Sequence, residues 1–491
     1  MQDKQLVPLG WVGILRLGLV QAALGAIVVL TTSTLNRVMV VELALPAMLP
    51  GILVSWYHAL QMMRPRFGYG SDVGGRRTPW IVGGMAVLAL GGLLAATAVA
   101  WMDSSLFLGV GLAVIGFTLI GFGLGAAGTN LLVLLAGRVS AERRAPAAMI
   151  VWVMMIIGFI ITAKLAGHFL DPFSLGRLVA VTGVVSLVAF VVAVLALGRL
   201  EYGQRVAPGP SEPIDLETTA LGGVGSAGAP AVSSADTSSE RPGFRAALAQ
   251  VWAEPAARHF TIFVFIAMLA YSGQDLILEP FAGTVFGLTP GESTSLAGTQ
   301  NQGLLFGMIL IAIMGRWGGP GALRTWTVIG CVTSAAALMS LVVGGALAPN
   351  WPLELSVLAL GVANGAFAVG AIGSMMALVS HGRERREGVR MGLWGAAQAI
   401  AMGLGGFLGT VAIDLTRVIF ASPVPAYTSV FAVEALLFLI AARLAAQVTL
   451  PGHREGPRAG TTRPASGPRP LQPAYAVQSG SGGLPQGEPN V

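Results

Sequence analysis

The feature that most constrains this chain is a series of twelve long apolar stretches, separated by short loops that are charged or rich in glycine and proline. A helix of about 20 apolar residues crosses the roughly 30 Å hydrocarbon core of a bilayer. Hydrocarbon offers no partner to a free backbone group and no alternating barrel pattern is visible, so we expect helices. The predicted spans are 11–35, 46–63, 80–101, 106–136, 147–170, 178–198, 259–281, 295–315, 325–346, 353–380, 389–413 and 427–447.

Composition excludes the other common classes of protein. Charged residues make up 11% of the 491 residues and hydrophobic residues 54%, whereas soluble domains carry roughly 25% charged residues. Disorder of the bulk of the chain would need low hydrophobicity and high charge. The single cysteine, Cys331, excludes a disulfide scaffold and multi-cysteine metal sites. The sequence therefore predicts an all-α polytopic membrane protein.

The basic residues are distributed unequally between the two sets of loops. The loops after the even-numbered spans contain 18 arginines, whereas the opposite loops contain three, Arg37, Arg177 and Arg417. The positive-inside rule places the arginine-rich loops, and with them both termini, in the cytoplasm. The net charge of +6 thus reflects membrane topology, and no nucleic-acid partner is predicted.

Four segments follow from this pattern. Residues 1–199 are predicted to form an N-terminal six-helix bundle and residues 258–450 a C-terminal six-helix bundle. Between them, residues 200–257 are rich in Gly, Ala, Pro and Ser, which is typical of a flexible cytoplasmic linker. Residues 451–491 are rich in Gly, Pro and Arg and are predicted to be a disordered cytoplasmic tail.

The loop after the second span carries a spaced motif, Gly68, Asp72, Gly75, Arg76 and Arg77. Its glycines allow a tight turn, and its aspartate can cap a helix and pair with an arginine of a neighbouring segment. A basic loop that only sets topology is the alternative. The spacing resembles the major facilitator superfamily signature G-x-x-x-D-x-x-G-R-[RK], which implies that fold and no particular substrate.

Acidic residues inside a predicted span are expensive and often functional. Asp275 and Glu279 lie four residues apart in the seventh span, hence on one helical face. They are either a proton or ligand site that faces a central cavity, or part of a helix end that Pro280 stops. Near the end of the first span, Arg37 and Glu42 can pair with each other or with these acids, as a gate or a structural clasp.

Other polar residues are weaker candidates. Asn36, Gln274 and Asn364 are predicted to line the cavity or gate. His58 and His168 are either axial ligands of a chelated metal such as chlorophyll magnesium, or hydrogen-bonded packing residues. Lys164, within the fifth span, is expected to extend outward. No ligand set for a resident metal and no nucleophile–base pairing that points to catalysis is recognised.

Two stretches, 35–43 followed by Pro46 and 274–281, resemble the PucC/LhaA family, the bacteriochlorophyll-delivery branch of the major facilitator superfamily. Within it, the chain is most similar to the branch labelled bacteriochlorophyll synthase chain. The resemblance covers about 11–450 and implies a light-harvesting complex assembly factor of the bacterial inner, photosynthetic membrane.

The same resemblance implies bacteriochlorophyll a or a precursor as bound cargo. It also implies partners among membrane lipids, antenna subunits and pigment-synthesis enzymes. We predict no enzymatic activity, because the Asp-rich motifs of a prenyltransferase are not recognised. The alternative is a proton-coupled transporter of a small solute, with Asp275 or Glu279 as the proton site.

Overall fold

The computed structural model describes residues 9–64, 66–67, 71, 76–198, 200, 252–314, 322–380, 387–420 and 422–447. In these residues the secondary structure is helical throughout, which confirms the predicted class. Most of the predicted linker, the predicted tail and three motif residues, Gly68, Asp72 and Gly75, lie outside the described residues.

The first half of the chain contains α1 (Trp11–Val29), η1 (Leu30–Thr34), α2 (Leu35–Arg37), η2 (Val38–Glu42), α3 (Met48–Leu60), η3 (Gln61–Met63), α5 (Thr78–Met102), α6 (Leu106–Arg138), α7 (Ala141–Leu170) and α8 (Leu175–Leu197). The second half contains α10 (Pro255–Phe286), α11 (Pro290–Met314), α12 (Ala322–Ala346), α13 (Leu353–Ser380), α14 (Glu387–Phe420) and α15 (Pro423–Gln447).

Eleven of the helices in the described part of the chain are long and apolar enough to cross a membrane. The predicted second span is the exception, because α3 has 13 residues and rises only about 20 Å, although the 3₁₀ turn η3 continues it. The number twelve is therefore approximate, but the chain is a multi-pass membrane protein. Large apolar side chains remain exposed on many helices, as expected for a surface that lipid covers.

Several helices extend beyond their predicted spans, and two of these extensions lie where the halves meet. The first span was predicted to end at residue 35, yet its helix continues through η2 to Glu42. The seventh was predicted to end at 281, but α10 ends only at Phe286, and the following Gly287, with a φ of 72°, has the left-handed conformation that closes a helix. The interpretation of Pro280 as a helix stop is wrong, since α10 continues for six more residues beyond it.

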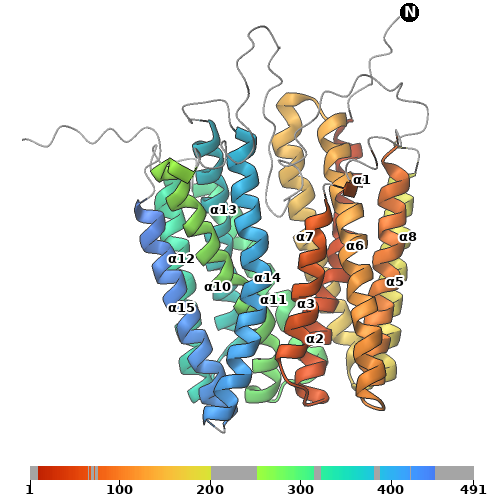
Figure 1. Ribbon diagram of the computed structural model, residues 1–491, viewed down its shortest axis with the longest axis vertical. Helices are drawn as coiled ribbons and strands as arrows, with labels where there is room; N and C mark the ends of the chain where they lie inside the picture. Colours follow the sequence, from red (N-terminus) through yellow and green to blue (C-terminus); the bar gives the residue numbers. More distant parts are fainter. Residues whose placement is uncertain are drawn as a thin grey trace, which may run out of the picture. The chain divides into compact units, whose positions relative to one another are not determined.

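Figure 1 shows the helices of the first half, in red to yellow, beside those of the second half, in green to blue. The halves meet along two helix pairs, α3 with α14 and α7 with α11, which we call the α3–α14 seam and the α7–α11 seam. Between the seams, η1, α2 and η2 contact α10. Most core residues of each half form one buried cluster, but Leu276 joins the cluster of the first half and Val40 that of the second.

Candidate functional site

The candidate site is built on a local change of winding at the end of the first helix. Two π-helical turns, η1 and η2, stand on either side of the short α2. The hydroxyls of Thr31 and Thr32 both donate to the Val28 carbonyl, at 2.8 and 3.1 Å, where the first π turn begins. A π turn holds an extra residue and changes the direction of the side chains that follow it, and such turns are frequent at functional sites. The change directs Asn36 and Arg37 of α2 toward the second half.

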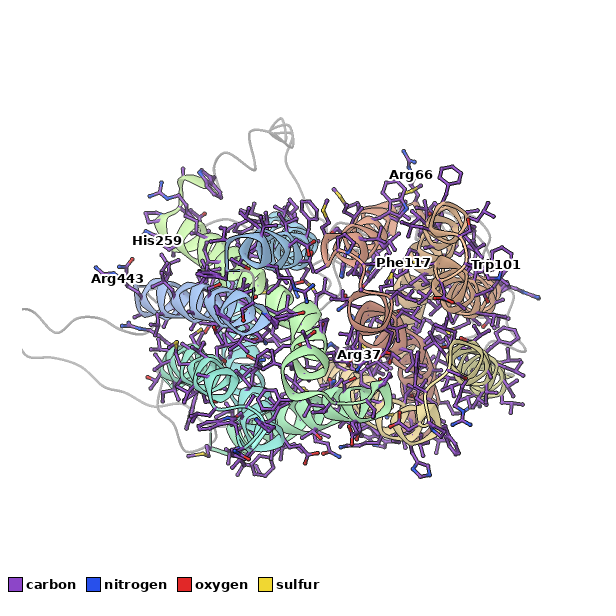
Figure 2. The ribbon with its side chains drawn as sticks, turned by 90° about the horizontal axis from the view of Figure 1, so that it is seen from below. Arg37, Arg66, Trp101, Phe117, His259 and Arg443 are labelled. Carbon is purple, nitrogen blue, oxygen red and sulfur yellow. The ribbon has the colours of Figure 1, made fainter. Side chains whose placement is uncertain are left out.

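Arg37 is buried, with 2% of its side chain exposed, and it joins the two halves. Its Nη1 donates to Glu42 Oε1 at 2.5 Å, and its Nη2 donates to the Leu288 carbonyl just beyond α10, also at 2.5 Å. The guanidinium lies against Gly283, where an added Cβ would be 2.9 Å from Nη2. Figure 2 places Arg37 between helices of the two halves. Of the predicted alternatives, Arg37 pairs with Glu42 and not with Asp275 or Glu279.

Asn36 compensates for the proline inside α10. Pro280 has no backbone N–H, so it leaves the carbonyl four residues earlier, that of Leu276, without its helical partner. The Asn36 Nδ2 donates to this carbonyl at 2.5 Å. One helical turn away from Arg37, Thr34 and Thr294 of α11 also join their hydroxyls at 2.9 Å. The first helix is therefore held to both α10 and α11 by polar contacts.

The two acids of α10 lie in different environments, although both were predicted on one face. Asp275 is the only exposed residue between Ala256 and Phe286. Glu279 is 3% exposed, and neither carboxyl oxygen has a hydrogen-bond partner within the described residues. Gln274 is fully buried, and its amide nitrogen and oxygen are equally without a partner there. The middle of α10 thus combines one exposed carboxyl with two buried polar side chains that are open to a ligand or a proton.

At each seam, an aspartate that was not identified in the sequence accepts hydrogen bonds at the start of a helix of the other half. Asp414 of α14 accepts hydrogen bonds from the backbone N–H groups of Ala47 and Met48, at 2.8 and 2.7 Å. Asp171, at the end of α7, accepts from the Thr289 hydroxyl at 2.6 Å and from the Gly291 N–H at 3.3 Å. A carboxylate at a helix N-terminus satisfies free amides and the helix dipole. The fifth helix of each half thus caps the second helix of the other.

Lys164 corrects a further expectation. It was expected to extend outward, but its Nζ donates to Ser295 Oγ at 3.1 Å and to Thr299 Oγ1 at 2.8 Å, both on α11. These residues are spaced four apart, so their hydroxyls share one face of α11. Lys164 therefore belongs to the α7–α11 seam.

The remaining residues of the loop motif and Asn364 lie apart from the contacts of η1, α2 and η2 with α10. In the loop motif, Arg76 is exposed, and Arg77 Nη1 donates to the Val133 carbonyl of α6 at 2.8 Å. Asn364 is 1% exposed and accepts a bond from Ser334 Oγ at 3.0 Å, between α13 and α12.

The two histidines have contrasting surroundings. His58 is half-buried on α3, with its ring 4.2 Å from that of Tyr57, and its Cβ approaches Gly403 of α14. His168 is exposed near the end of α7, beside Phe169, which is 60% exposed. His58 therefore adjoins the α3–α14 seam, whereas His168 lies on an apolar outer surface.

Some of this arrangement could have been read from the sequence. Thr289 and Glu292 have the spacing of a capping box, and Pro280 marks Leu276 as a carbonyl in need of a donor. By contrast, Asp171, Asp414 and Lys164 carry no local signal, because their partners are more than 100 residues away in the chain.

Comparison with known proteins identifies the family of the chain. Residues 34–452 match the family model described as PUCC protein. The bacteriochlorophyll synthase 44.5 kDa chain of Rhodobacter capsulatus is 48% identical over 90% of this chain and 96% of its own length. Protein PucC of the same organism is 27% identical over 90% and 93% of the two chains.

Solved structures with a similar fold include a variant of the peptide transporter POT in complex with sulfate. It has a TM-score of 0.63 and 15% identity, and the match covers 91% of this chain and 97% of that chain. At this identity the likeness concerns the fold, which is the two-bundle fold of the transporters.

Proposed function

The chain belongs to the PUCC protein family, and from this premise we propose that it is a light-harvesting complex assembly factor that binds bacteriochlorophyll and delivers it in the photosynthetic membrane. The observation that carries the proposal is the match over nearly the whole chain to a relative whose name includes bacteriochlorophyll, combined with a fold shared with transporters. A carrier with this fold can hold a cargo between its halves and release it when they move.

The cargo in this proposal is bacteriochlorophyll a or a precursor. Two histidines are candidate ligands of its magnesium, because a neutral imidazole is a suitable axial ligand. His58 adjoins the α3–α14 seam, where a cargo between the halves would be reached. His168 lies on the exposed apolar surface of α7, where a pigment could enter from lipid.

The proposed function includes a membrane location and a set of partner proteins. We propose the bacterial inner, photosynthetic membrane, with both termini in the cytoplasm. The proposed partners are antenna subunits and pigment-synthesis enzymes. The chain would act as a carrier, so the synthase in the relative's name would refer to a process in which it takes part. Turnover of a pigment precursor by the isolated chain would contradict this.

One absorption spectrum of the full chain, purified from a phototrophic host, tests the proposal. We expect co-purified tetrapyrrole and lowered antenna assembly after deletion of the gene. The variants His58→Phe and His168→Phe identify the ligand, and His259→Phe, near the start of α10, is the matched control. Preparations that bind no bacteriochlorophyll or precursor, and with which no antenna subunit or pigment-synthesis enzyme co-purifies, would exclude the proposal.

A proton-coupled transporter of a small solute is the second candidate, and the exposed carboxyl of Asp275 in an otherwise covered helix favours it. This function predicts uptake into proteoliposomes that a pH gradient drives and that Asp275→Asn abolishes. Asp103→Asn, which changes an exposed acid just after α5, should leave that uptake unchanged. Pigment-loaded protein without any such flux would rule the transporter out.

A further inference from the structure

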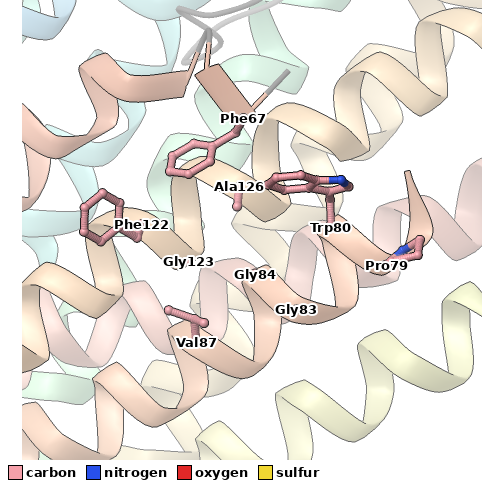
Figure 3. A pocket seen from close by; sticks show the side chains of 9 residues that line it. All are labelled: Phe67, Pro79, Trp80, Gly83, Gly84, Val87, Phe122, Gly123 and Ala126. Carbon is pink, nitrogen blue, oxygen red and sulfur yellow. The ribbon is translucent and has the colours of Figure 1, made fainter. Parts of the chain in front are cut away.

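A groove of about 300 Å³ lies between α5 and α6, away from the contacts between the two halves. Figure 3 shows the rings of Phe67, Trp80 and Phe122 around it, with glycines of both helices below them. This volume is at the lower end of the range for ligand pockets. The groove can therefore enclose part of a ligand whose remainder stays outside.

The floor of the groove is backbone because glycines bring α5 and α6 together. A Cβ added at Gly84 would lie 2.6 Å from the Ala127 nitrogen, and one added at Gly123 would lie 2.5 Å from the Leu88 nitrogen. These positions accept no side chain without separating the helices. Gly83 is different, because it is exposed and an added Cβ would have no atom within 4 Å. The groove is thus open at Gly83, in the surface that lipid covers.

The walls are aromatic and held in place. The rings of Phe67 and Phe122 meet edge to face, with centroids 6.1 Å apart and an interplanar angle of 88°. Phe67 also lies on Gly125 of α6, with its Cε2 3.1 Å from the position of an added Cβ. Aromatic walls over a backbone floor favour a flat conjugated ring, with which they can make offset and edge contacts.

Two arginines lie close in the chain to residues that line the groove. Arg66 immediately precedes Phe67, and Arg76 lies three residues before Pro79, which also lines the groove; both arginines are exposed. Arginine is suited to a carboxylate, which its planar fork can bind through two hydrogen bonds. The chain therefore offers, beside an apolar and aromatic groove, two exposed arginines within three residues of its lining.

We propose that this groove is a binding site for a flat tetrapyrrole that carries a free carboxylate, with the ring edge between Phe67, Trp80 and Phe122 and the carboxylate at Arg66 and Arg76. The inference rests on the proposed function, and it specifies the cargo as a pigment acid before its esterification. It also gives this cargo an entry on the membrane-facing side of α5 and α6.

The test uses the full chain in nanodiscs, titrated with bacteriochlorophyllide, which has a free propionate, and with bacteriochlorophyll, in which that propionate is an ester. We expect the acid to bind at least tenfold more tightly than the ester. Gly83→Leu should lower the affinity for the acid at least tenfold, because it fills the groove. Gly111→Leu is the matched control, since Gly111 of α6 is equally exposed with no atom within 4 Å of an added Cβ.

The double variant Arg66→Gln with Arg76→Gln tests the two arginines independently and should remove the preference for the acid while leaving the affinity for the ester unchanged. Equal affinities of the wild-type chain for acid and ester would overturn the proposal. So would wild-type affinity of a folded Gly83→Leu chain, or displacement of the pigment by phosphatidylglycerol at equal concentration. If pigment binds but these variants do not affect it, the groove assignment alone fails; if no tetrapyrrole binds, the proposed function fails with it.

Discussion

At the α3–α14 seam, Asp414 accepts hydrogen bonds from two backbone amides at the start of α3, whereas at the α7–α11 seam Asp171 accepts only one amide and a hydroxyl at the start of α11. The helices that they cap also differ. No side chain of its own caps the start of α3. The α11 helix has a complete capping box, because Thr289 N donates to Glu292 Oε2 at 2.9 Å and Glu292 N donates to Thr289 Oγ1 at 3.1 Å.

Aspartates at equivalent positions of the two halves therefore need not contribute equally to the free energy of unfolding. The start of α11 is satisfied by its own sequence, so Asp171 adds to an existing cap. The start of α3 depends on the other half, so contact between the halves and order at this helix end are linked. We therefore expect the α3–α14 seam to be the more sensitive of the two to loss of its aspartate.

The largest effect is expected from Asp414→Ala, which leaves two amides of α3 unsatisfied. Loss of a cap and of charge-assisted hydrogen bonds should lower the free energy of unfolding by about 2 kcal/mol. Thermal unfolding in one detergent measures the change. Asp414→Asn, which keeps one acceptor oxygen, should fall between the variant and the wild type. A wild-type melting temperature for Asp414→Ala would show that the start of α3 does not depend on this aspartate.

Loss of the hydrogen bond from Asn36 to the Leu276 carbonyl, between the two seams, should give the next largest effect. Asn36→Ala leaves the buried Leu276 carbonyl without a donor, at a cost of about 1.5 kcal/mol. In a Pro280→Ala background, the restored backbone N–H at position 280 can donate to that carbonyl, so the same substitution should cost almost nothing. A double-mutant cycle measures the coupling. If the two substitutions are additive, Asn36 does not act through the proline.

Asp171→Ala should have a smaller effect, about 1 kcal/mol or less, because the capping box remains. In a Glu292→Ala background, Asp171 is the main remaining cap of α11, so its loss should cost more. The same unfolding assay reads all four chains. An effect of Asp171→Ala as large as that of Asp414→Ala would show that the capping box does not make the difference.

The smallest effect is expected from Lys164→Met, which removes the two hydrogen bonds to α11 but keeps the apolar stem. Methylenes of Lys164 pack against Gly298, whose added Cβ would lie 3.2 Å from Cγ. We expect a loss below about 1 kcal/mol for methionine and a larger one for Lys164→Ala, which also removes this packing. Equal melting temperatures for the two variants would exclude a contribution of the stem.

Features of the fold that depend on neighbouring residues in the chain can be predicted from the sequence. Hydropathy found every described helix of the bundle to within several residues, because bilayer burial depends on a window of neighbouring side chains. It placed the end of the first helix seven residues too early, since Asn36, Arg37 and Glu42 lower the hydropathy there. Asn36 and Arg37 continue the helix because the second half covers them, which no window of sequence can show.

Hydropathy and local motifs are enough to predict the number and order of apolar helices to a close approximation, the family, and the two stretches around Arg37 and Asp275 that carry the resemblance. The packing of the two bundles is needed to show that Arg37 pairs with Glu42, that Asn36 donates to Leu276, and that Asp414 caps a helix 366 residues away. The physical reason is that such polar groups accept several partners of equal chemistry. Which partner lies within 3 Å depends on how the two bundles pack, and that packing is a property of the whole chain.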